Sequence, residues 1–122
     1  MDIRPVITGA DAFFYELASM SKYGLHGKLT AKPGQSDQLA AVLLEAARLV
    51  STAPGCQLYA VSKSEEDANS VWVTEIWDSK EAHDESLKAP EVRALIGEAM
   101  PLLDGPPAGG QVLEVLGGVG VS

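Results

Sequence analysis

Four segments of the chain have the short apolar patterns that predict β-strands. In the first, YGLHGKLTA at residues 23–31, apolar and polar residues alternate with the period of a strand, and KPGQ then stops it. The second and third, residues 56–63 and 71–77, are joined by the polar turn SEEDANS and predict a hairpin. The fourth covers residues 111–119 and is weakened by glycines at its end.

Two other segments repeat their apolar residues every three or four positions, which predicts amphipathic helices. The first helix begins at Ser36 and ends before the turn residues APG. The second begins at about Ser79, where Asp78 and Glu81 resemble a capping box, and Pro90 interrupts it because proline lacks the backbone donor. We expect the apolar stripe beyond this proline to be buried; it consists of Val92, Leu95, Ile96, Ala99, Met100 and Leu103.

The order strand, helix, strand, strand, helix, strand predicts an α+β domain of the ferredoxin-like, split βαβ type. Its antiparallel sheet carries helices on one face only. Alternation places Trp72, Thr74 and Ile76 on one side of the third strand, and Val73 and Glu75 on the other. Both sides are largely apolar, and an exposed apolar sheet face marks an interface. We therefore expect a homodimer in which two sheets pack face to face through the side that carries Trp72.

The first twenty residues differ from the rest and predict an N-terminal extension, residues 1–20, before a single domain at residues 21–122. Within the extension, Phe13, Phe14 and Leu17 recur at helical spacing, so we expect a short amphipathic helix over residues 11–20 that packs on the dimer. The alternative is an extension without a structural role.

Composition narrows the classes of partner. The net charge is −8 and no run of lysine or arginine occurs, which argues against nucleic acids and anionic membrane surfaces. No apolar run approaches the ~20 residues that cross a bilayer, and the N-terminus makes a poor secretory signal. The one cysteine, Cys56, excludes an intrachain disulfide. We expect a cytoplasmic protein.

Glu75 and His83 are the two residues most suited to chemistry. Glu75 stands in the middle of an apolar strand, and burial in such a place makes a carboxylate a general acid or base near neutral pH. His83 and Ser86 lie three positions apart and share a helix face with Leu87, which should point inward. The alternatives are a Glu75 that pairs with a cation or lies at a wet sheet edge, and a His83 on the helix surface.

A pocket for a flat aromatic ligand is predicted on the same side of the sheet. Trp77 and Tyr59 would line it, together with Val73 and Ser86, although such aromatic residues more often belong to the core. No second histidine or cysteine stands at ligand spacing, so no metal site is predicted. Motifs for a nucleotide, nicotinamide, flavin or nucleophilic serine are also missing from the sequence.

From Tyr23 to about Val115 the chain resembles the antibiotic biosynthesis monooxygenase domain, and most closely its quinol monooxygenase branch. The most specific piece is TEIWDSKEAHDES, which matches the pattern E-x-W-x-S-x-x-A-H-x-x-S from Glu75 to Ser86. APGC before the second predicted strand is a second match. Residues 1–19 lie outside the resemblance.

The resemblance implies a dimeric α+β barrel with a pocket between sheet and helices in each subunit. It also implies oxidation of a quinol or phenolic aromatic by O2, with no metal or flavin, and Glu75 and His83 in the pocket as candidate catalytic residues. Two alternatives remain open, because a fold does not fix a reaction. One is a ligand-binding or stress-response protein without turnover, and the other is a cofactor-free isomerase of a small carbonyl compound.

Overall fold

The computed structural model describes residues 21–107 and 109–121. Its elements in chain order are β1 (Lys22–Thr30), α2 (Ser36–Val50), β2 (Cys56–Lys63), β3 (Ser70–Trp77), α3 (Lys80–Ser86), α4 (Pro90–Ala99), the 3₁₀ turn η1 (Met100–Leu102) and β4 (Gln111–Val115). The helix expected over residues 11–20 lies outside the described residues and stays a prediction. No helix in the described ranges is long and apolar enough to cross a membrane.

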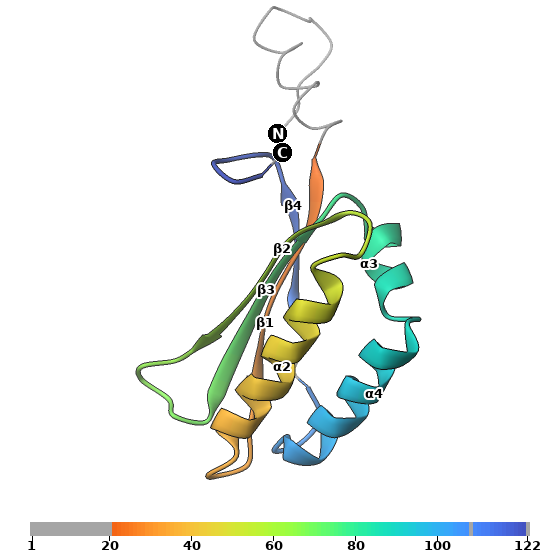
Figure 1. Cartoon of the computed structure of the whole chain (residues 1–122). Helices are drawn as coiled ribbons and strands as arrows, with labels where there is room; N and C mark the ends of the chain where they lie inside the picture. The colour runs from red at the N-terminus through yellow and green to blue at the C-terminus, as the bar shows by residue number, and fades with distance from the viewer. Residues whose placement is uncertain (1–20, 108, 122) are drawn as a thin grey trace, which may run out of the picture.

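The four strands form one antiparallel sheet in the order β2-β3-β1-β4. Helices α2, α3 and α4 all lie over the same face of this sheet (Figure 1). This order and this one-sided cover confirm the predicted ferredoxin-like α+β fold. Pro90 begins α4, as expected for a residue whose missing N–H is harmless in a first helical turn.

The register of the sheet places Glu75 at its centre. Glu75 on β3 stands opposite Leu25 on β1 and opposite Tyr59 on β2. Paired residues in antiparallel strands point to the same face, so these three side chains meet under the helices. His26 pairs with Thr74 and therefore points to the outer face, away from the helices.

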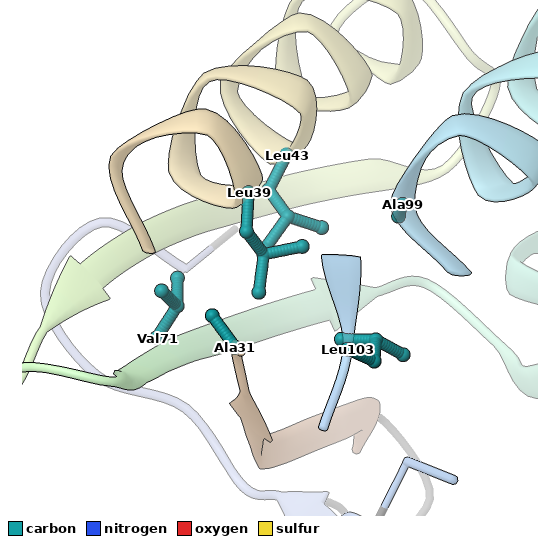
Figure 2. Packing of buried hydrophobic residues seen from close by; sticks show 6 residues of the cluster. All are labelled: Ala31, Leu39, Leu43, Val71, Ala99 and Leu103. Carbon is teal, nitrogen blue, oxygen red and sulfur yellow. The ribbon is translucent and has the colours of Figure 1, made fainter. Parts of the chain in front are cut away.

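The buried core consists of two clusters. In the first, Leu39 and Leu43 of α2 reach down toward the sheet, and Figure 2 shows them above Val71 and Ala31. Ala99 and Leu103 complete this cluster. The second cluster contains Val50, Trp77 and Val92, at the end of the sheet nearer α3. The two clusters hold the helices on the sheet at separate places.

Three details of the elements differ from the sequence prediction. The N-cap of α3 is Ser79, whose Oγ accepts from the backbone N–H of Ala82 at 3.1 Å. The predicted capping box with Asp78 is wrong, because the Asp78 carboxylate accepts a hydrogen bond from Gln57 instead. The stripe of α4 is only partly buried, since Ile96 and Met100 are about half exposed. The last strand ends at Val115 rather than residue 119.

Candidate active site

A cavity of about 210 Å³ lies between the sheet and helices α2 and α4. It opens where the two core clusters meet, since Leu43 and Val50 of different clusters both line it. Its walls are almost entirely aliphatic. Among the described residues that line it, Glu75 is the one charged side chain, and Ser86 and Tyr59 supply hydroxyl groups. The cavity therefore suits an apolar molecule that presents a polar group to Glu75.

A second hollow of about 220 Å³ adjoins the first along β1. Four residues line both hollows: Leu29, Leu43, Tyr59 and Glu75. Val73 lines the second hollow but not the first. Ligand pockets commonly measure about 300–1,000 Å³, so each hollow by itself is small. Glu75 and Tyr59 stand at the junction, where either hollow reaches them.

The Glu75 carboxylate is held in place by Trp77. The indole Nε1–H of Trp77 donates to Glu75 Oε1 at 2.9 Å. Trp77 is completely buried and does not line either hollow, so its described role is to hold Glu75 rather than to face a ligand. The Glu75 side chain is 16% exposed, which is low for a carboxylate and leaves it dependent on such donors.

His83 lies behind Glu75 as seen from the cavity. Its Nε2 is 4.0 Å from Glu75 Oε1, and its side chain is 13% exposed. The ring packs against Tyr23, with centroids 5.4 Å apart, and meets Trp77 edge-on at 5.8 Å. The other nitrogen, Nδ1, lies 2.9 Å from Asp84 Oδ1. The structure thus brings His83 and Glu75 together, while placing only Glu75 in the cavity lining.

The close approach of α3 depends on a glycine in the APGC segment. Gly55 has a φ of +86°, which favours glycine, and a Cβ there would come within 2.8 Å of Ala82 Cβ on α3. Its carbonyl oxygen also accepts from the backbone N–H of Asp78 at 2.8 Å, which fixes the turn into the helix. Gly55, Ser79 and Ala82 together set His83 beside Glu75.

Tyr59 and Cys56 lie beside Glu75 and stay protonated. Burial, followed by the charge of Glu75, raises the pKa of the Tyr59 hydroxyl well above its usual range. The same two causes, burial first, raise the pKa of the Cys56 thiol. Tyr59 is therefore a neutral hydroxyl group at the junction of the two hollows, able to donate a hydrogen bond to a ligand.

Two contacts of His83 were missed by the sequence reasoning. Asp84 follows His83 directly, and neighbours along a helix do not share a face, so spacing gave no signal for this pair. Tyr23 lies on β1, far from His83 in the sequence. It comes near His83 because the β1–β3 register pairs it with Trp77, at the end of β3 just before α3. Ser86 lines the cavity as predicted, although its Oγ donates to the carbonyl oxygen of His83 at 2.6 Å. Within the described ranges, no group of three potential ligand residues is placed to hold a metal ion.

Comparison with known proteins identifies the family. Residues 23–98 match the sequence model of the family described as antibiotic biosynthesis monooxygenase. The chain belongs to this family. The matched segment runs from β1 into α4 and so contains Glu75, Trp77 and His83. It leaves out β4 and the N-terminal extension.

Solved structures agree with the family. A protein named "putative Antibiotic biosynthesis monooxygenase" from Chloroflexus aurantiacus J-10-fl is 40% identical, with 84% of this chain and 100% of that chain covered and a TM-score of 0.76. A Nitrosomonas europaea protein of unknown function is 27% identical, with 81% and 93% covered and a TM-score of 0.68. A structure from Caulobacter crescentus CB15 shares the fold, at 21% identity, 84% and 97% coverage and a TM-score of 0.72. No curated protein matches the chain significantly.

Proposed function

We propose that the protein is a cofactor-independent monooxygenase that oxidises a quinol or another phenolic aromatic with O2. The observation that carries this proposal is one carboxylate, Glu75, in the wall that an aliphatic cavity shares with a second hollow, with His83 4.0 Å from it. Membership of the antibiotic biosynthesis monooxygenase family supports oxygenation as the reaction class. We therefore prefer a monooxygenase to the two alternatives, an isomerase and a ligand-binding protein without turnover.

The site favours a flat, apolar substrate that carries an acidic hydroxyl group. Leu43 and Ile96 offer aliphatic surface to a ring, and Tyr59 offers both an aromatic edge and a hydroxyl donor. An ionised carboxylate only accepts hydrogen bonds, so Glu75 selects a group that donates one. In this pose the phenolic hydroxyl points to Glu75 and the ring extends along the walls of the cavity.

The reaction balances without another reductant. A phenol or quinol with a hydrogen-bearing carbon ortho or para to the ionising hydroxyl group combines with one O2 to give one water and a quinone, which is a hydroxyquinone when the substrate is a 1,4-hydroquinone. Glu75 takes the phenolic proton, and the phenolate passes one electron to O2, giving an aryloxyl radical and superoxide. These recombine at the hydrogen-bearing ortho or para carbon as a peroxide, which takes a proton back from Glu75. Removal of the ring hydrogen then breaks the O–O bond, forms the carbonyl and releases water.

The protein contributes three effects to this sequence. General-base assistance by Glu75 is worth roughly 100- to 10,000-fold. The aliphatic walls hold the ring in one orientation. They also keep bulk water from the charged intermediates until the peroxide has formed.

The decisive experiment measures oxygen uptake with a panel of substituted 1,4-hydroquinones, naphthols and anthrones, under air and under nitrogen. With a substrate that is turned over, Glu75→Gln should lower kcat about 100- to 10,000-fold, because the amide keeps the Trp77 hydrogen bond but is no base. The matched control is Glu98→Gln, at an exposed position on α4, which should keep the wild-type rate. Wild-type turnover by Glu75→Gln contradicts the mechanism. Binding without oxygen uptake would indicate a binding protein, and conversion under nitrogen would indicate an isomerase.

We also infer that the protein acts as a homodimer through the outer sheet face. Trp72, Thr74 and Ile76 lie there, flanked by the exposed Leu58 and Leu113. His26 stacks on Trp72 there, with ring centroids 4.9 Å apart, and adds aromatic surface to this face.

Light scattering at micromolar concentration tests the dimer. Leu113→Lys should yield a monomer, because it buries a charge in the inferred interface. The matched control is Leu44→Lys, at another exposed leucine, on α2, which should stay dimeric. A wild-type monomer would refute the interface.

A further inference from the structure

We infer that Asp84 is a positioning residue, which fixes His83 in the tautomer whose free Nε2 accepts a proton from Glu75. The inference rests on the proposed function and adds to it a route for the proton out of the cavity. It follows from a continuous line of side chains on β3 and α3. This line runs from Glu75 in the cavity wall, through His83, to Asp84 at the surface.

The tautomer follows from the chemistry of the Asp84 contact. Asp84 Oδ1 lies 2.9 Å from His83 Nδ1, and an ionised carboxylate has no proton to donate, so Nδ1 must carry the hydrogen. Lys80 donates to the other oxygen, Oδ2, at 2.6 Å. Its hydrogen bond, together with that of His83, holds the pKa of the Asp84 carboxyl below its usual range. Asp84 therefore remains an acceptor, and in the neutral ring Nε2 keeps its lone pair.

The free nitrogen is directed at Glu75. His83 Nε2 lies 4.0 Å from Glu75 Oε1, about 1 Å beyond a hydrogen bond. Such contacts are commonly long before substrate binds, and a small rotation of the carboxylate or one water closes the gap. Tyr23 and Trp77 pack on the ring and restrict its orientation. The charged and titratable groups described around the ring are thus Glu75 on β3, Tyr23 on β1, and Asp84 with Lys80 on α3.

The line starts at two mostly buried side chains and ends at one that is open to solvent. The side chains of Glu75 and His83 are 16% and 13% exposed, whereas that of Asp84 is 45% exposed. When Glu75 has taken the phenolic proton, it passes that proton to Nε2, and the ring becomes an imidazolium between two carboxylates. No electrons move in this step, and the proton returns by the same path when the peroxide forms.

The tautomer is measured without any substrate. Two-bond ¹H–¹⁵N correlation spectra of the uniformly labelled full chain, at a pH where the rings are neutral, distinguish a protonated Nδ1 from a protonated Nε2. The sequence has two histidines, so His26 is an internal reference, and His83→Ala assigns the signals. We expect His83 with its hydrogen on Nδ1. In Asp84→Ala the ring should shift to the Nε2–H form, because the acceptor at Nδ1 is lost while Glu75 still faces Nε2, and Asp84→Glu should restore the Nδ1–H form in part. Glu85→Ala, on the same helix, should change neither.

Kinetics then test whether the tautomer matters. With a quinol that the wild type oxidises, Asp84→Ala should lower kcat about 10- to 100-fold and leave KM within about twofold, since Asp84 does not line the cavity. Asp84→Glu should retain more of kcat than Asp84→Ala does, and the control Glu85→Ala should keep the wild-type kcat. An Nε2–H tautomer in the wild type overturns the inference, and so does an Asp84→Ala variant that turns over at the wild-type rate. If no quinol is oxidised at all, the proposed function fails, and the spectra still decide whether Asp84 sets the tautomer.

Discussion

Replacing Leu39 by alanine tests whether the first core cluster, rather than the cavity wall, holds α2 on the sheet. Leu39 is 0% exposed and packs among Ala31, Val71 and Leu103 without lining the cavity. A buried Leu→Ala change removes three carbon atoms from a closely packed site and leaves a void. The typical loss is about 3–5 kcal/mol of the free energy of unfolding. Small domains are stable by about 5–15 kcal/mol, so the loss is a large share of the total.

The matched control is Leu44→Ala on the same helix, where the leucine is 57% exposed. Helix propensity changes equally in both variants, so their difference isolates burial. We expect Leu44→Ala to stay within about 0.5 kcal/mol of the wild type, and Leu39→Ala to melt roughly 10–20 °C lower. The assays are urea and thermal unfolding followed by circular dichroism, at one protein concentration because a dimer would unfold in a concentration-dependent way. Equal losses in the two variants, or a loss below about 1 kcal/mol for Leu39→Ala, would refute the assignment.

Three further outcomes are expected. Gly55→Ala should lower the free energy of unfolding by about 2–4 kcal/mol, because the new Cβ would lie 2.8 Å from Ala82 at a φ that is already unfavourable. Gly34→Ala has a similar φ of +80° but open space around it, so it should cost only about 1 kcal/mol. Urea unfolding measures both losses. Burial raises the pKa of Tyr59 in the folded protein, so folding is favoured at pH values below the unfolded-state pKa of ~10, and this contribution is lost as the pH rises further. Urea midpoints should therefore fall at alkaline pH, and should fall less in Tyr59→Phe. Ile96→Trp should raise KM about tenfold for a bulky quinol with little change in melting temperature, since Ile96 is half exposed at the cavity.

The sequence predicted most of the fold because its patterns are local. Alternation in the third strand placed Glu75 and Trp77 on the helix face, and the structure confirms that assignment. The glycine-rich end after Val115 was extended too far, because Gly117 and Gly118 take backbone angles outside those of a strand. Ile96 was expected in the core since its spacing is helical, but spacing does not show how wide a stripe the sheet covers.

The candidate site was harder to predict from the sequence, because it depends on strand register and on side-chain direction. Opposing Tyr59 to Glu75 requires the β2–β3 register, which includes an irregularity between Cys56 and Leu58 that no sequence pattern indicates. Trp77 was predicted as a ligand-facing wall, and its burial and hydrogen bond to Glu75 emerge only from coordinates. The catalytic roles of Glu75 and His83 stay predictions until turnover is measured.

The division of the core into two clusters has a consequence for how the family diversifies. Leu39 and Trp77 hold the helices from either side, so the half-exposed Ile96 and Met100 between them contribute little to folding. Changes at such positions cost little free energy, while altering the shape that a substrate meets. Selection can therefore vary the wall of the cavity without first acquiring compensating mutations. A fold built this way can keep Glu75 on its central strand while the shape of the cavity beside it changes.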